Sequence, residues 1–321
     1  MKNAIQYYYN LYPDDIHQKK SRCSFTYNQE KYVLMLYSDD ISLVKVIYDF
    51  HIFLLNNGIY VHQIILNRNS QILTTINNEE YVLLKISSNI IKRLINLNDI
   101  KNFSFLIIKA NQRENHKNKR EKTNDIFKIL GRENLFLLWS NKNDHLEYQI
   151  SQIGLKYHLI SESFHYYIGL GETAIQLINQ IPTANISSVA HKRLDYKSTL
   201  FDLYNPLNLI IDSRVRDAAE FFKSSFFYKK DLENEKFEQT IYSFLASSRF
   251  TNEEYIIFFA RMLYPTYYFD LYELIIIGKE NEEAIKKITS KAADYEILLR
   301  NIYRYYRSFI QIDPIEWLEK L

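Results

Sequence analysis

The chain has 321 residues, enough to bury a large core and, at ~100–200 residues per domain, to form two domains or lobes. Its 40 Lys and Arg against 38 Asp and Glu leave a net charge of +2, and this near balance does not favour nucleic acid as a partner. A hydrophobic content of 47% excludes a chain that is disordered by composition.

The first 86 residues have mainly the alternating pattern of strands. Apolar residues at helical spacing predict one helix over residues 41–55, which ends near Gly58 because glycine tolerates the left-handed backbone. Asn28-Gln29-Glu30 predicts a hairpin turn. Five runs rich in β-forming residues predict strands: 23–27, 32–37, 60–66, 71–76 and 81–86. We therefore expect an N-terminal β-rich lobe over residues 1–86, with one helix on an antiparallel sheet.

From about Asn89 onward the pattern is helical almost throughout. Ser161 is a candidate N-cap for a helix over 164–181. Two stretches have capping-box spacing and predict helix starts: Asp217-Ala218-Ala219-Glu220 and Thr251-Asn252-Glu253-Glu254. A further amphipathic helix is predicted over 144–157, and a final helix over about 281–308. We expect a mainly helical C-terminal lobe over residues 87–321 and an α+β fold overall.

A charged segment over residues 109–122 contains six basic and two acidic residues. We interpret it as a solvated loop or the charged end of a helix. The alternative is a patch for nucleic acid or an anionic surface, although the segment has no interleaved aromatic residues on which bases could stack.

The single cysteine, Cys23, cannot form an internal disulfide and favours a reducing compartment. The N-terminus lacks the apolar region of a signal peptide, and no apolar run approaches the ~20 residues of a membrane span. We therefore expect a cytoplasmic protein without a membrane segment. The eight histidines are scattered, and no HExxH or GxSxG motif occurs, so the sequence predicts neither a metal site of this kind nor hydrolase chemistry.

Glycine is scarce, which bears on phosphate binding. The chain has six glycines and none before Gly58, so the first hairpin cannot wrap phosphates with a glycine-rich loop. Gly169 and Gly171 lie within a helical pattern and predict close helix packing. Neither a Rossmann fingerprint nor a Walker A motif is present.

The segment 188–223 carries the most informative motifs. A short predicted strand leads into His191-Lys192-Arg193-Leu194, and the apolar run Leu209-Ile210-Ile211 ends at Asp212. This arrangement resembles the aminoglycoside-phosphotransferase/choline-kinase superfamily, whose active site has a His-Gly-Asp-Leu type loop, then an Asn, then an apolar strand that ends in a metal-binding Asp. Further stretches resemble the spore-coat CotS/YutH-like proteins of Firmicutes more closely: DHLEYQIS at 144–151, SFHYYIGLGETAI at 163–175, RDAAE at 216–220 and RMLYPTYYFDLYE at 261–273.

The resemblance covers most of the chain and implies a two-lobed, protein-kinase-like fold. The chain departs from the family at three of four functional positions. Arg193 stands where the family has the catalytic Asp, Ser198 where it has the Asn, and Met35 where it has the phosphate-binding Lys. Arginine is always charged and cannot accept a proton as a base would. Because only Asp212 remains, as a weak metal ligand, the sequence predicts a pseudokinase with no intact catalytic residue and no ATP or Mg²⁺ as cofactor.

The first hypothesis for function is therefore a non-catalytic protein that binds an unidentified protein partner as a scaffold or structural component. The resemblance implies a spore-coat or sporulation-associated role. The second hypothesis is an active small-molecule phosphotransferase that uses ATP and Mg²⁺ in a rearranged site. In that case Asp195, Asp202 or Asp217 replaces the missing base.

Two interpretations remain for the residues of the degenerate site. In the structural one, Asp212 pairs with Arg214 or Arg216, and His191 is a hydrogen-bonded core histidine. In the other, four basic residues form an anion site, since arginine suits bidentate contacts to phosphate or carboxylate. These residues are Lys192, Arg193, Arg214 and Arg216.

Overall fold

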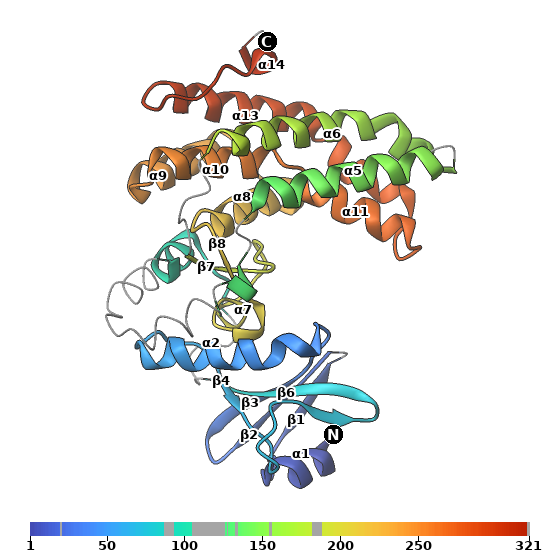
Figure 1. Ribbon diagram of the computed structural model, residues 1–321. Helices are drawn as coiled ribbons and strands as arrows, with labels where there is room; N and C mark the ends of the chain where they lie inside the picture. Colours follow the sequence, from blue (N-terminus) through green and yellow to red (C-terminus); the bar gives the residue numbers. More distant parts are fainter. Residues whose placement is uncertain are drawn as a thin grey trace. The chain divides into compact units, whose positions relative to one another are not determined.

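The computed structural model describes residues 1–19, 21–86, 93–104, 126, 128–131, 134–153, 156–181 and 188–319. The chain divides into two compact units, each built from two stretches (Figure 1). The N-terminal unit comprises Met1–Gly131 and Lys197–Ile211, and the C-terminal unit comprises Arg132–Tyr196 and Asp212–Leu321. The predicted boundary between the lobes at residue 86 is based on the change from strand to helix periodicity along the sequence, and it stays a prediction. The basic segment 109–122 lies outside the described residues.

The N-terminal unit contains an antiparallel sheet in the order β1-β2-β3-β6-β4, with β5 paired to β6. Its strands are β1 (Ile16–Lys19), β2 (Arg22–Tyr27), β3 (Glu30–Leu36), β4 (Gln63–Ile65), β5 (Thr74–Ile76) and β6 (Glu79–Ile86). The predicted hairpin joins β2 to β3 through Asn28 and Gln29, whose φ angles of 50° and 64° are those of a type I′ turn. Turns of this type match the twist of the flanking strands, so the local sequence is sufficient to predict this hairpin.

Among the described residues of 1–86, two α-helices accompany the sheet, where the sequence predicts one. The predicted helix is present as η1 (Ile41–Leu43) followed by α2 (Val44–Asn56), and Gly58, with φ of +73°, lies just beyond its end. The second helix, α1 (Lys2–Tyr9), buries Ile5 and Tyr9 in a core cluster with side chains of β2, β3 and β6. The sequence does not predict α1 or the edge strand β1, because each is short: α1 depends on this packing and β1 on its pairing with β2.

The C-terminal unit is mainly helical in the part of the chain that the structure describes. Its helices are α5 (Leu135–Ile153), α6 (His158–Asn179), α8 (Arg216–Tyr228), α9 (Asn234–Ser248), α10 (Asn252–Leu263), α11 (Thr266–Ile276), η4 (Glu282–Ile285), α12 (Lys286–Thr289), α13 (Ala292–Arg307) and α14 (Glu316–Glu319). One short strand, β7 (Ser188–His191), also belongs to it. α10 packs against α6, α8 and α13. The predicted α+β class is confirmed.

The N-caps predicted from the sequence can be compared with the observed first residues of the helices in this unit. The capping box of Thr251 and Glu254 is confirmed at the start of α10. The prediction that Ser161 is an N-cap is wrong, because α6 begins at His158 and the Ser161 hydroxyl donates to the carbonyl of Tyr157 at 2.8 Å. The hydroxyl thus bonds back to the preceding turn, a local alternative open to serine inside a helix.

The predicted cap at Asp217 is also wrong. α8 begins one residue earlier, at Arg216, and the Asp217 carboxylate bonds to His191, 26 residues away in sequence. The single helix predicted over 281–308 is likewise wrong, because η4, α12 and α13 divide this stretch, with a break at Ser290 and Lys291.

Close packing in the C-terminal unit involves one of the two helical glycines. A Cβ atom on Gly171 would lie 2.8 Å from Nδ2 of Asn143 in α5, whereas a Cβ on Gly169 would meet nothing within 4 Å. The predicted close approach is therefore confirmed at Gly171 and wrong at Gly169.

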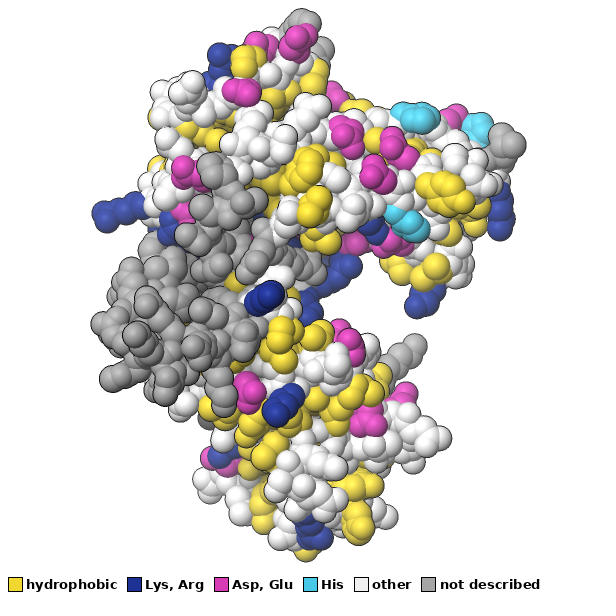
Figure 2. All heavy atoms as spheres, viewed as in Figure 1, with side chains coloured by type: hydrophobic (Ala, Val, Ile, Leu, Met, Phe, Trp, Pro, Cys, Tyr) yellow, Lys and Arg dark blue, Asp and Glu magenta, His cyan; other side chains and the backbone are white. Residues whose placement is uncertain are grey.

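The surface fits the balanced composition. Charges of both signs are interspersed on the face shown in Figure 2, as expected for a net charge of +2. Among the described residues, no helix is both long and apolar enough to span a membrane.

Candidate functional site

The C-terminal unit brings together the motif residues His191 and Asp212 through one side chain. Arg216, in the first turn of α8, donates from Nη1 to Oδ2 of Asp212 at 3.0 Å. The same guanidinium donates from Nε to the carbonyl of His191 at 2.9 Å and from Nη2 to that of Lys192 at 3.2 Å. The planar fork of arginine allows these directed contacts from one group. Arg216 thereby ties the end of β7 to the carboxylate at the end of β8 (Leu209–Asp212).

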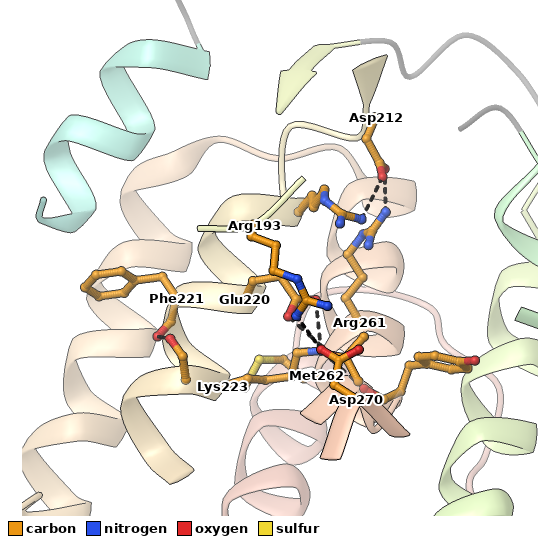
Figure 3. Close-up of polar contacts among 12 residues, drawn as sticks. Arg193, Asp212, Glu220, Phe221, Lys223, Arg261, Met262 and Asp270 are labelled. Carbon is orange, nitrogen blue, oxygen red and sulfur yellow. Dashed lines mark hydrogen bonds and ion pairs between the residues drawn. The ribbon is translucent and has the colours of Figure 1, made fainter. Parts of the chain in front are cut away.

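The Asp212 carboxylate has a second cationic partner, Arg261 of α10. Arg261 donates from Nη2 to Oδ1 of Asp212, which also accepts from the Ser213 amide at 2.6 Å (Figure 3). Asp212 is 6% exposed. Burial alone would raise the pKa of this carboxyl, but Arg261 and Arg216, with the Ser213 hydrogen bond, hold it below its ordinary value. Both carboxylate oxygens are thus bound to guanidinium groups.

Arg261 is a site residue that sequence reasoning missed. It is fully buried, and its guanidinium carbon lies 5.8 Å from the centre of the Trp139 ring, which stacks on Tyr264 at 4.2 Å. The available signal was an arginine between Ala260 and Met262 in an otherwise apolar stretch of α10. A charge at a buried helical position requires a partner, but the sequence does not say which one.

His191 and Asp217 form a second buried contact. Nδ1 of His191 lies 2.7 Å from Oδ2 of Asp217, and the His191 amide donates to Oδ1 at 3.0 Å. Asp217 is therefore committed to holding the loop and is not positioned as a free base. Asp202 is engaged in the same way by Thr199, through its amide at 2.7 Å and its hydroxyl at 2.9 Å. Asp195, the third candidate replacement base, is exposed.

The four residues of the predicted anion site have internal contacts. Arg214 makes a bidentate pair with Glu254 of α10, and the exposed Arg193 pairs with Asp270 of α11. With Arg216 on Asp212, three of the four already have carboxylate partners. The fourth, Lys192, is half-buried and also has contacts. The geometry therefore gives the anion-site hypothesis no support.

Glu220 and Lys223, both in α8, extend the buried charges and were not predicted. Lys223 Nζ lies 3.0 Å from Oε1 of Glu220 and donates to Oγ1 of Thr266 at 2.6 Å and to the carbonyl of Tyr264 at 3.2 Å. Burial lowers the pKa of Lys223, and the Glu220 charge opposes this. Burial would raise the pKa of Glu220, but Lys223 and Arg216 hold it below its ordinary value. Glu220 and Lys223 thus neutralise each other within α8.

Met35 and Ser198 belong to the N-terminal unit. Met35 lies in β3, in register with Arg22 of β2, and its sulfur accepts from Nδ2 of Asn205 at 3.7 Å. The Ser198 carbonyl accepts from the amide of Ile95 at 3.0 Å. Among the described residues, no three His, Cys, Asp or Glu side chains are grouped as a metal site.

Comparisons with known proteins agree with this architecture. Residues 2–302 match the family described as "Spore coat putative kinase YutH". The endospore coat-associated protein YutH of Bacillus subtilis (strain 168) is 24% identical over 178 residues, which are 50% of this chain and 52% of that protein. The match thus spans about half the length of this curated relative.

Solved structures share the fold at low identity. An aminoglycoside phosphotransferase from Alicyclobacillus acidocaldarius has a TM-score of 0.60 at 10% identity, over 96% of this chain and 97% of that one. The AMP-bound spectinomycin phosphotransferase APH(9)-Ia has a TM-score of 0.61 at 9% identity, over 94% and 96% of the two chains. The predicted kinase-like fold and the resemblance to this superfamily are confirmed, and the chain belongs to the spore coat YutH family of kinase-like proteins.

Proposed function

We propose that this protein is a catalytically impaired member of its family that works by binding another protein in the spore coat. The contact of both Asp212 oxygens with Arg216 and Arg261 carries this proposal. A catalytic Mg²⁺ is usually held by one or two carboxylates together with substrate phosphates. At Asp212, a metal ion would have to displace two buried guanidinium groups before it could bind.

The other departures point the same way. Arg193 places a permanent cation where a proton acceptor is required, and it pairs with Asp270. Met35 offers no charge to a phosphate group. Asp202 and Asp217, two of the candidate replacement bases, hold local structure through their hydrogen bonds. Binding without phosphoryl transfer is therefore the function that these contacts support best.

The catalytic part is tested with labelled ATP and Mg²⁺ or Mn²⁺, against choline, sugars, aminoglycosides and protein hydroxyls. We expect no transfer and no Mg²⁺-dependent ATP binding in a thermal-shift assay. The control is Asp212→Asn, which keeps the side-chain shape, with far-UV circular dichroism as the check of folding. Transfer that disappears in Asp212→Asn would overturn the proposal, whereas transfer that persists in this variant comes from a contaminant.

The spore-coat part requires a separate test, because it rests on the family and on the coat association printed for the Bacillus subtilis relative. A fluorescent fusion of the full chain, produced in sporulating Bacillus subtilis that lacks its own YutH protein, should gather at the coat. An Asp212→Asn variant that passes the same check of folding should gather there too, because binding of this kind needs no phosphoryl transfer. A uniform cytoplasmic signal from the wild-type fusion would contradict this part of the proposal.

A further inference from the structure

A short stretch of the N-terminal unit, residues 198–208, is held by parts of that unit far away in sequence; we call it the docked segment. It contains α7 (Leu200–Leu203) and η3 (Pro206–Asn208). Its first residues pair with the chain around Leu94, through a bond from the Leu200 amide to the Arg93 carbonyl at 3.0 Å and a bridge between Leu94 and Thr199.

Its later residues contact the sheet and α2. Asn205 donates to the sulfur of Met35 in β3, and η3 packs against α2. The guanidinium carbon of Arg22 in β2 lies 5.7 Å from the centre of the Phe201 ring. The docked segment therefore covers the position where the family has its phosphate-binding lysine.

His62, which precedes β4, makes the most direct contacts with the docked segment. Its amide donates to the carbonyl of Tyr204 at 2.9 Å, and its ring Nε2 lies 3.1 Å from the carbonyl of Phe201. The hydroxyl of Tyr60 lies 3.3 Å from the other ring nitrogen, Nδ1. A carbonyl can only accept, so Nε2 carries the proton and Nδ1 accepts from Tyr60. The bond to Phe201 would persist in the charged ring, so what opposes protonation is the burial of a charge.

Packing completes the enclosure of this ring. The His62 side chain is fully buried, and its ring stacks on Phe201 with centroids 4.9 Å apart at 28°. It also meets the Tyr204 ring edge-on at 6.3 Å. An added proton would therefore place a cation inside an aromatic cluster.

Among the charged groups that the structure describes around the cluster, none offers His62 a carboxylate contact. Arg22 faces Phe201 and is itself a cation. Arg93 pairs with Asp99 at 2.7 Å, and their charges reach the hydroxyl of Tyr204. Asp202 is engaged by Thr199 within the docked segment. Consistent with this setting, burial lowers the pKa of His62 to about 4, and its hydrogen bond to Phe201 only partly opposes that effect.

We propose that His62 is an acid-sensitive latch, whose protonation releases the docked segment and uncovers β3 at Met35. Release lets the charged ring be hydrated, which removes the cost of burying its charge. The sign follows from linkage, because the released state binds the proton more tightly than the docked state. Release is therefore favoured as the pH falls from about 6.5 towards 4 and is unaffected above that range. A His62 pKa of about 6.5 in the released state and about 4 in the docked state raises the ratio of released to docked segment about 30-fold at pH 5.0 relative to pH 8.0.

The test is amide hydrogen exchange of the full chain at pH 5.0 and 8.0, with each rate referred to its intrinsic rate at that pH. Protection of residues 198–208 should fall about 30-fold at pH 5.0 in the wild type. In His62→Gln, which stays neutral, protection should be the same at both pH values. The matched control is His51→Gln in α2. His51 is a second buried histidine, but its Nε2 accepts from the Ile64 amide and not from the docked segment, so this variant should keep the response.

Unchanged protection in the wild type at pH 5.0 would overturn the latch, as would a pH response that survives in His62→Gln. Should His62→Gln fail to fold, the ring signals of His62 in the wild type decide by nuclear magnetic resonance. Titration near pH 6.5 while the segment stays protected refutes the proposal, and titration together with loss of protection supports it. Neither readout involves nucleotide or phosphoryl transfer, so the result is independent of the proposed function.

Discussion

Asp212 shows how two arginines stabilise a charge that water hardly reaches. Its side chain is 4% exposed and those of Arg216 and Arg261 are 10% and 2% exposed, so all three charges lose most of their hydration on folding. Mutual attraction offsets this loss only while the set is complete. Removal of one member leaves a buried charge without its partner, which costs more free energy than the pair contributes.

We predict that Arg261→Met lowers the free energy of unfolding of the C-terminal unit by roughly 3–5 kcal/mol, the usual cost of breaking a buried ion pair. Methionine keeps much of the apolar contact with Trp139 but leaves Oδ1 of Asp212 without its cation. Urea unfolding followed by far-UV circular dichroism measures the change. Arg193→Met is the control, because Arg193 is 78% exposed and its pair with Asp270 should contribute less than ~1 kcal/mol.

Asp212 and Arg261 allow a second comparison, in which both residues are changed together. Asp212→Asn removes the carboxylate on which both Arg261 and Arg216 act, so the loss in the Asp212→Asn, Arg261→Met double variant should be smaller than the sum of the two single losses. Additive losses in the double variant would show that Arg261 acts through packing on Trp139 and not through Asp212.

At the scale of elements, local signals predict local structure and fail where a distant partner decides. The β2–β3 hairpin follows from Asn28 and Gln29, because two adjacent left-handed residues determine the turn. Asp217 has good cap chemistry, yet its carboxylate bonds to His191 instead. Sequence spacing cannot reveal that competition, since the competing donors come from the end of another element.

Gly171 provides a prediction about the packing of α5 on α6. Gly171→Ala should destabilise the protein by about 1–3 kcal/mol, because the new Cβ would press on the buried amide of Asn143, which bonds to Glu172 at 2.7 Å. Gly169→Ala, in the same helix and with open space, should instead stabilise it by about 0.5–1 kcal/mol through helix propensity. The midpoints of thermal unfolding of the two variants should therefore move in opposite directions. Equal shifts would refute the close contact.

For the molecule as a whole, the sequence predicts the fold class and part of the site. The change from strand to helix periodicity and the His191 and Asp212 motifs are enough for a kinase-like α+β protein, and the family match confirms it. The sequence does not predict that Arg261, 49 residues after Asp212, completes the charge cluster. An ion pair between distant helices depends on tertiary packing, which no local pattern specifies.

The two units contain different titrating groups. In the N-terminal unit, burial lowers the pKa values of His51 and His62 to about 4 each. A lowered histidine pKa favours the unfolded state as pH falls from about 6.5 towards 4. In the C-terminal unit, the pKa values of Asp212 and Glu220 are lowered instead. A lowered carboxyl pKa contributes stability that is lost only at lower pH, as the pH falls through the pKa of the folded state, below the ordinary carboxyl range.

We therefore predict that acid weakens the N-terminal unit first, by roughly 3 kcal/mol for each histidine between pH 7.5 and pH 4. The chain provides a reporter for each unit: the single buried cysteine, Cys23, lies in the N-terminal unit, and both tryptophans, Trp139 and Trp317, lie in the C-terminal unit. In urea at pH 4.5, Cys23 labelling with dithiodipyridine should reach its midpoint at lower urea than the tryptophan fluorescence transition. The gap should shrink at pH 7.5 and in the His51→Gln, His62→Gln double variant. A gap that does not change with pH would refute the assignment of acid sensitivity to these two histidines.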